Sequence, residues 1–275
     1  MKSMLKIALA QLNSVNSTEK NFAEIEKLIL SCNALPDLEK PKLILFPENS
    51  LFFRIDENEK VKALNISDSI FIKLQKLSNE MKIYLHLTTA IEEAGKIWNT
   101  SVLISPTEKI KILYKKIHLF DIALVDQKPI RESDVFTHGE EASVFEIEGV
   151  KFGSSICYDI RFSELYSEYA KAEVDVLLVP SAFLVKTGIA HWEVLLRARA
   201  IESQCFLLAA AQSGKHHSVT SEQFRETYGH TLAIGPWGDV LGVLKQETGL
   251  LFFDIDPEQC IRVRKQIPMK NHRRL

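Results

Sequence analysis

The chain has 275 residues, 46% of them hydrophobic and 25% charged, with a formal net charge of −2. This length and hydrophobic content suit one large folded domain or two small ones and exclude a disordered chain. The near-neutral charge gives no electrostatic basis for binding nucleic acid or an anionic membrane surface, and no apolar run approaches the ~18 residues that span a bilayer.

The cysteines and the N-terminus bear on the cellular compartment. The four cysteines are far apart and form no CxxC pair, which predicts neither a disulfide framework nor a structural zinc site: Cys32, Cys157, Cys205 and Cys260. The N-terminal residues do not have the pattern of a secretory signal. We therefore expect a cytoplasmic protein without a bound metal.

The first half of the chain predicts helices between buried strands. Apolar residues recur on one helical face after a capping Ser17 or Thr18, and short apolar runs mark the strands. The expected helices cover residues 18–32 and 66–81, and the expected strands cover 4–11, 42–46, 83–89, 98–105 and 109–114.

A long irregular stretch, 115–141, separates this half from the next. Loops of this length inside a compact domain are usually functional or disordered, and its interleaved apolar residues argue against disorder. Beyond it we expect helices at 163–172, 189–204 and 257–266, a polar loop at 218–227, and strands at 143–147, 150–156, 174–179, 206–211, 229–234, 239–244 and 249–255.

No linker or internal repeat divides the chain. Helix-flanked strands alternate with hairpin-like pairs, which favours a single layered α/β domain with mixed sheets over residues 1–275.

Residues 150–162 combine an apolar strand with a cysteine at its end. Cys157 is followed by the polar pair Tyr158-Asp159, and a helical pattern begins near Ser163. A thiol on a strand-to-helix turn is well placed for a nucleophile, because the strand fixes it and nearby N–H groups point toward a bound group. The alternative is that Cys157 is a small buried hydrophobic residue.

Two further reactive side chains follow predicted strands. Glu48 follows strand 42–46, and Lys116 follows strand 109–114, although spacing alone does not distinguish Lys116 from Lys115. A carboxylate, an ammonium and the Cys157 thiol at one sheet edge can carry out acyl transfer without a histidine. Each residue also has an ordinary alternative as a solvated surface charge.

Four separated segments resemble the nitrilase superfamily of carbon–nitrogen hydrolases, in its order and spacing. They are Phe46-Pro47-Glu48-Asn49, residues 115–121 (KKIHLFD), Arg131-Glu132-Ser133 and residues 156–162 (ICYDIRF). The similarity extends over essentially the whole chain.

This resemblance implies roles for particular residues. Glu48 corresponds to the general base, Lys116 to the oxyanion stabiliser and Cys157 to the nucleophile, while Glu132 helps position the lysine and the substrate. The amide N–H of Tyr158 is the natural second oxyanion donor, because it belongs to the turn that presents the sulfur. No metal or organic cofactor is needed.

The family fold is a four-layer α-β-β-α sandwich. Its subunits pair, so we expect a homodimer or a higher homo-oligomer, with the C-terminal extension at about 257–275 contacting a partner subunit.

Residues 180–202 and 204–217 resemble the amidase members of the superfamily, in particular those that cleave deaminated glutathione to 2-oxoglutarate and cysteinylglycine. One alternative is an ω-amidase acting on 2-oxoglutaramate or another small dicarboxylate monoamide. Another, from a different class, is a member that serves mainly as a binding or scaffold protein; the presence of Glu48, Lys116, Glu132 and Cys157 speaks against it.

Five residues are candidates for substrate binding. Arg161 binds a substrate carboxylate or pairs with an acid in the helix cap, and Phe183 lines the pocket or belongs to the core. The expected basic loop at 215–217 faces the carboxylate of a dipeptide leaving group or is simply solvated. Its residues are Lys215, His216 and His217.

Overall fold

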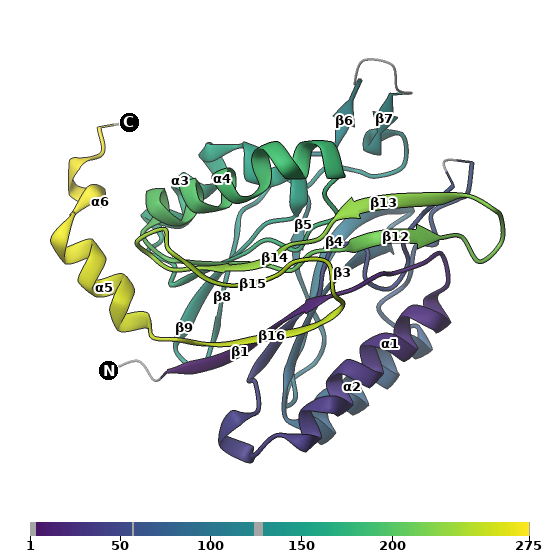
Figure 1. Cartoon of the computed structure of the whole chain (residues 1–275), viewed down its shortest axis with the longest axis horizontal. Coiled ribbons are helices and arrows are strands. Elements are labelled where there is room, and N and C mark those ends of the chain that lie inside the picture. The colour runs from purple at the N-terminus through teal and green to yellow at the C-terminus, as the bar shows by residue number, and fades with distance from the viewer. Residues whose placement is uncertain (1–3, 57, 124–128, 275) are drawn as a thin grey trace.

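The structure is a computed structural model that describes residues 4–56, 58–123 and 129–274. Two six-stranded mixed sheets share one hydrophobic core, and a pair of helices covers the outer face of each sheet (Figure 1). This arrangement confirms the predicted four-layer α-β-β-α sandwich. No helix among the described residues is long and apolar enough to cross a membrane.

The first sheet comes mainly from the N-terminal half. Its strands are β1 (Leu5–Gln11), β2 (Leu43–Leu45), β3 (Tyr84–Glu93), β4 (Lys96–Ile104), β5 (Lys111–Lys115) and β16 (Gly249–Ile255). They lie in the order β16-β1-β2-β3-β4-β5, with β1, β2 and β3 parallel and the other neighbours antiparallel.

The second sheet comes from the C-terminal half. Its strands are β8 (Ser143–Ile147), β9 (Val150–Ser154), β10 (Val176–Leu178), β11 (Phe206–Ala209), β14 (Thr231–Ile234) and β15 (Val240–Leu244). They lie in the order β15-β14-β11-β10-β9-β8, and β9, β10 and β11 are parallel. Because neighbouring parallel strands end at the same sheet edge, the residues after β2, β9 and β10 can converge.

All of the described α-helices except the last, which has no buried residue, bury apolar side chains in the cores. The helices are α1 (Thr18–Ser31), α2 (Ser69–Met81), α3 (Ser163–Lys171), α4 (Val185–Ser203), α5 (Pro257–Gln266) and α6 (Met269–His272). Successive side chains of β1 point to opposite faces of the sheet. Leu5, Ile7 and Leu9 pack in the core shared by both sheets, whereas Ala8 and Ala10 pack in the core beneath α1 and α2.

The prediction of a polar loop at 218–227 is confirmed for 218–223 and wrong for 224–227, and the reading of 215–217 as part of a loop is wrong. Strands β12 (Ser213–His217) and β13 (Phe224–Tyr228) pair antiparallel from Ser213 and Tyr228 to His217 and Phe224. The buried side chains of this hairpin are themselves polar, as with His216 and Thr227. A strand is usually recognised in a sequence by apolar residues that alternate with polar ones, and this hairpin lacks that pattern.

Helix α4 begins at Val185, four residues before its predicted start at 189. Gly188 lies within its first turn, and a Cβ at this position would lie 2.3 Å from Cγ of Tyr228 on β13. A residue that lowers helix propensity is therefore required here, because the helix backbone touches the hairpin. This contact fixes the hairpin against the second sheet's helices.

The stretch at 115–141 contains short elements that the sequence did not predict. They are β6 (Asp121–Ile122), β7 (Ile130–Arg131) and a 3₁₀ turn at Glu132–Asp134. Part of the stretch, residues 124–128, lies outside the described residues.

The segment after β16 packs on its own chain. The Gln204 side chain donates to the Ile267 carbonyl at 2.7 Å, and Lys270 pairs with Glu173 at 2.8 Å. The contact between this segment and a partner subunit stays a prediction.

Candidate active site

Cys157 lies just past the end of β9, in a backbone conformation that few residues with a Cβ adopt. Its φ is +48°, and this left-handed region costs such a residue roughly 1–2 kcal/mol. Its N–H donates to the Pro180 carbonyl at 3.0 Å, which ties the bend to the chain after β10. A 3₁₀ turn, Cys157–Arg161, follows at once. The strained bend places the thiol at the sheet edge instead of inside the strand.

Asp159 holds this bend in place. Its carboxylate accepts hydrogen bonds from the Ile156 N–H at 2.8 Å and from the Tyr114 hydroxyl at 2.8 Å. It also accepts from the His118 N–H at 3.0 Å and lies 2.7 Å from Nδ1 of the same histidine. Because Tyr114 and His118 flank Lys116 in sequence, this buried carboxylate fixes the cysteine turn relative to the lysine.

Glu48 follows β2 and is only 4% exposed. Its Oε1 accepts hydrogen bonds from Nζ of Lys116 and from Nδ2 of Asn99, each at 2.9 Å. Its Oε2 accepts from the Ala182 N–H, after β10, at 3.0 Å. The carboxylate is therefore held by donors from both sheets, which satisfies a group that is costly to bury unpaired.

Lys116 follows β5 and is 2% exposed. Besides Glu48, its Nζ contacts Oε2 of Glu132 at 2.8 Å and Oε1 at 3.1 Å. Burial by itself lowers the pKa of Lys116, but the Glu132 and Glu48 carboxylates outweigh burial and hold this pKa well above its usual value. The lysine is thus a fixed ammonium.

The neighbouring lysine has a different environment. Nζ of Lys115 lies 4.2 Å from the centroid of the Trp98 ring and pairs with Glu93 at the surface. The structure therefore separates the two lysines that sequence spacing left equivalent.

Asn99, on β4, is a functional candidate that the sequence analysis missed. Its Nδ2 donates to Oε1 of Glu48 and to Oε1 of Glu132, both at 2.9 Å, and the residue is 1% exposed. Glu132 also accepts from the Phe120 N–H at 2.7 Å. An asparagine inside a predicted buried strand was the available signal, since asparagine is depleted in strands.

Burial and the Glu48 carboxylate keep the Cys157 thiol protonated. Burial raises the pKa of Cys157 well above its usual value, and the Glu48 carboxylate adds to this effect. The Lys116 ammonium and the Ala182 N–H act in the opposite direction without reversing the shift. A protonated thiol beside a carboxylate is an acid–base pair that can react when a carbonyl carbon approaches the sulfur.

The carboxylates of this site are bridged by an ammonium and an amide. Glu48 and Glu132 share Lys116 and Asn99 as donors. Among the described residues, no group of three His, Cys, Asp or Glu side chains could hold a metal ion.

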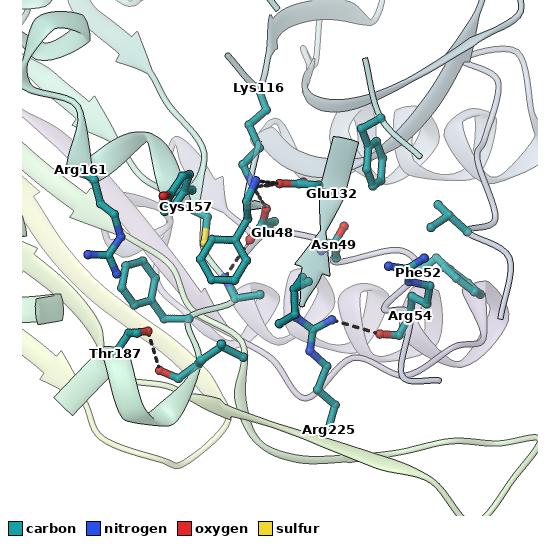
Figure 2. A pocket seen from close by; sticks show the side chains of 18 residues that line it. Glu48, Asn49, Phe52, Arg54, Lys116, Glu132, Cys157, Arg161, Thr187 and Arg225 are labelled. Atoms are coloured by element: carbon teal, nitrogen blue, oxygen red, sulfur yellow. Dashed lines mark hydrogen bonds and ion pairs between the residues drawn. The ribbon is translucent and has the colours of Figure 1, made fainter. Parts of the chain in front are cut away.

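Glu48, Lys116, Glu132 and Cys157 form the base of one pocket of about 780 Å³, and we call these four residues the floor (Figure 2). The predicted residues Tyr158, Arg161 and Phe183 also line the pocket. The Tyr158 N–H lies in the first turn of the 3₁₀ segment, where N–H groups have no partner within the turn. The guanidinium of Arg161 lies 5.6 Å from the centroids of both the Tyr158 and the Phe183 rings.

Arg54 and Arg225 line the pocket as well, and the sequence analysis missed both. We call Arg54, Arg161 and Arg225 the rim. Arg225 lies on β13, within the segment predicted to be a loop, so no sequence signal placed it at the site. The only pattern available was the positive charge itself.

Lys215, His216 and His217 do not line the pocket, which corrects their predicted placement at the substrate. On β12 their side chains alternate: Lys215 and His217 are exposed and flank the Phe224 ring, whereas His216 is fully buried. His216 Nδ1 lies 2.7 Å from the Ser14 carbonyl, and its Nε2 lies 2.7 Å from the Thr227 hydroxyl. His216 therefore supports the hairpin from behind the pocket.

Known proteins with similar sequences or structures identify the family. The family model described as carbon–nitrogen hydrolase matches residues 6–265. The chain is 34% identical to deaminated glutathione amidase of Dictyostelium discoideum, over all of this chain and 96% of that protein. It is 35% identical to the protein of the same name from Synechocystis, over 99% of each. The crystal structure of the Caenorhabditis elegans NitFhit protein superimposes with a TM-score of 0.86 at 31% identity, covering 99% of this chain and 66% of that one.

Proposed function

The chain belongs to the carbon–nitrogen hydrolase family, and on that premise we propose that it hydrolyses deaminated glutathione to 2-oxoglutarate and cysteinylglycine. That it is an amidase of the nitrilase superfamily follows from the family match and from its relatives. The observation that carries the proposal is the convergence of Glu48, Lys116 and Cys157 in one pocket. The names of the relatives supply the substrate.

The first half of the reaction forms an acyl-enzyme. The Cys157 sulfur attacks the amide carbonyl carbon while Glu48 accepts the thiol proton. The carbonyl electron pair moves to oxygen, where the Lys116 ammonium and the Tyr158 N–H stabilise the negative charge. When the pair returns, the C–N bond breaks, and the leaving nitrogen takes the proton from Glu48. Cysteinylglycine departs, and a thioester remains on Cys157.

The second half hydrolyses the thioester. Glu48, again a carboxylate, accepts a proton from water as the water oxygen attacks the thioester carbonyl. The same two donors stabilise the second oxyanion. When this intermediate collapses, the C–S bond breaks, the sulfur takes back the proton from Glu48, and 2-oxoglutarate is released. Glu132 and Asn99 take no proton; they hold Lys116 and Glu48 in position.

An ω-amidase acting on 2-oxoglutaramate would form the same thioester and differ only in expelling ammonia. The floor accommodates both reactions equally, since in each of them the leaving nitrogen takes the same proton from Glu48. Substrate preference therefore has to be measured. We expect kcat/KM for deaminated glutathione to exceed that for 2-oxoglutaramate at least tenfold on one preparation, and a preference for 2-oxoglutaramate would overturn the proposed substrate.

The thioester is tested separately by mass spectrometry of the acid-quenched enzyme. Wild type mixed with deaminated glutathione should carry a 2-oxoglutaryl adduct on the peptide containing Cys157, and Cys157→Ala should carry none. If wild type turns over substrate rapidly without any adduct on this peptide even at the shortest quench times, the covalent route is wrong. The same adduct excludes a purely binding or scaffold role.

A further inference from the structure

The pocket contains more positive charge than its floor neutralises. Among its described lining residues, four cations face two carboxylates. Lys116 is paired with both carboxylates, Glu48 and Glu132. Within the described residues, none of the three rim arginines forms a salt bridge with an acidic side chain, although all three are half-buried. Half-buried cations without a counterion are costly, so the pocket favours an anionic ligand.

Arg161 provides positive charge on one side of the cysteine. It stacks between the Tyr158 and Phe183 rings, and its Nη1 lies 3.2 Å from Nδ1 of His191. These contacts fix the plane of the guanidinium and leave donors for a ligand.

Arg54 and Arg225 lie on the other side of Cys157 (Figure 2). Nη1 of Arg225 donates to the Arg54 carbonyl at 3.4 Å, and its guanidinium lies 5.2 Å from the centroid of the Phe53 ring. Phe53 in turn packs on the His216 ring, with centroids 4.4 Å apart. The buried hairpin face thus positions Arg225 through an aromatic stack.

The space beyond Arg54 and Arg225 is larger than the pocket itself. A second hollow of about 1750 Å³ shares Arg54, Ile130, Leu184 and Arg225 with the pocket. It continues along the start of β13 in the β12–β13 hairpin. Apart from the shared Arg54 and Arg225, its charged lining residues are Arg131, Asp56 and Asp134, so the residues that this hollow adds bring no excess of cations. A longer leaving group has room in this direction.

We propose that Arg54 and Arg225 form an anion subsite for the leaving group, across Cys157 from an acyl-side subsite at Arg161. The substrate class is then a linear amide with a carboxylate on each side of the scissile bond. This proposal rests on the amidase function above and deepens it, because ammonia as leaving group makes no use of the second subsite. A bidentate guanidinium–carboxylate contact supplies both charge and orientation.

The test is kinetic, with Arg225→Gln as the variant. For deaminated glutathione its KM should rise roughly 10–100-fold, the effect of one charge-assisted hydrogen-bonded pair. For 2-oxoglutaramate kcat/KM should change less than about twofold, whereas Arg161→Gln should lower kcat/KM for both substrates. Lys215→Gln is the matched control, because it removes a cation from the paired strand of the same hairpin but outside the pocket.

A modified substrate separates charge recognition from structural damage. Deaminated glutathione with its glycine carboxylate converted to an amide should be as poor a substrate for wild type as the native compound is for Arg225→Gln. Combining the two changes should add little further loss. Arg225→Lys should recover part of the affinity. Equal losses by Arg225→Gln on the native and amidated substrates would overturn the subsite.

Product binding distinguishes failure of the subsite from failure of the proposed function. Binding of cysteinylglycine to Cys157→Ala, measured by calorimetry, should weaken at least tenfold when Arg225→Gln is added. If wild type does not cleave deaminated glutathione but this dependence holds, the proposed function fails and the subsite stands. If wild type cleaves deaminated glutathione and the affinity for cysteinylglycine does not change with Arg225→Gln, only the subsite fails.

Discussion

The floor and the rim of the pocket are held by different interactions. Each floor carboxylate and Lys116 makes several charge-assisted hydrogen bonds, and these side chains follow strand ends or a short turn. The rim arginines lie on a loop, a 3₁₀ turn and a hairpin and make few hydrogen bonds, and two of them, Arg161 and Arg225, lie against aromatic rings. This difference suits a division of work: a rigid set for bond breaking and a more adaptable set for substrate selection.

The largest expected effect removes the cation of the floor. Lys116→Met should lower kcat by roughly 10³-fold or more, because it removes an oxyanion donor and leaves Glu48 and Glu132 without their shared ammonium. Turnover of deaminated glutathione measures this. Lys115→Met is the control and should stay within about threefold of wild type, since Lys115 pairs with Glu93 at the surface. Similar losses for the two variants would mean that the division between floor and surface is wrong.

The next effect tests whether Asn99 belongs to the floor. Asn99→Leu should lower kcat roughly 10–100-fold with little change in KM, because Glu48 and Glu132 lose a shared donor. A merely structural role would lower the melting temperature and leave the kcat of the folded enzyme unchanged. Thermal unfolding and kcat, measured together, distinguish these outcomes.

A third change acts on the rim alone. Gly188→Ala places a Cβ against the Tyr228 ring and should push α4 from the hairpin, at a cost of about 1–3 kcal/mol in stability. KM for deaminated glutathione should rise several-fold, while the burst of thioester formation at saturating substrate should stay within about twofold. Ala190→Val, at an exposed position of the same helix, should change neither quantity. A burst that slows in parallel with the rise in KM would contradict independent behaviour of floor and rim.

The last effect concerns His216, which supports the rim from behind the pocket and affects stability without affecting turnover. Burial lowers the pKa of His216 to about 4, and the nearby Arg225 adds to this. The unfolded chain gains a proton near pH 6.5, whereas the folded chain does not until about pH 4. The stability linked to this site is therefore fully present above pH 6.5 and is lost as the pH falls toward 4, by about 3 kcal/mol in total.

Urea unfolding between pH 7 and pH 4 checks this. His216→Gln keeps both hydrogen-bonding partners available and should show a shallower loss of stability with acid than wild type. Burial also lowers the pKa of His86 to about 4, so part of the slope should remain. The exposed His217→Gln should keep the full wild-type slope.

The floor could be located from the sequence because each of its parts has a local signal. Apolar runs mark where β2, β5 and β9 end, and Glu48, Lys116 and Cys157 follow these ends directly. The short sequence motifs around them resemble those of the nitrilase superfamily. Spacing could not separate Lys115 from Lys116, since the two differ only in which one enters the sheet edge.

Two of the three rim arginines, Arg54 and Arg225, could not be located in this way, because they join the pocket only through tertiary contacts. Arg225 lies on a strand whose buried neighbours, His216 and Thr227, are polar and satisfy each other by hydrogen bonding. Such a strand has no hydrophobic alternation. Asn99 likewise donates hydrogen bonds to Glu48 and Glu132, which lie 51 and 33 positions away from it in the chain. The basic run at 215–217 attracted attention by composition, yet strand geometry turns two of its side chains away from the pocket and buries the third.

By itself, the sequence determined the layered α/β class, the order of most elements and the identity of the floor residues, because strand ends and local motifs are encoded by neighbouring residues. Only the tertiary structure added Arg54 and Arg225 to the cations around the reacting sulfur. The position of Arg225 depends on how α4 packs against the β12–β13 hairpin and on the Phe53 ring beside its guanidinium. Such contacts join distant parts of the chain, so no local pattern carries them.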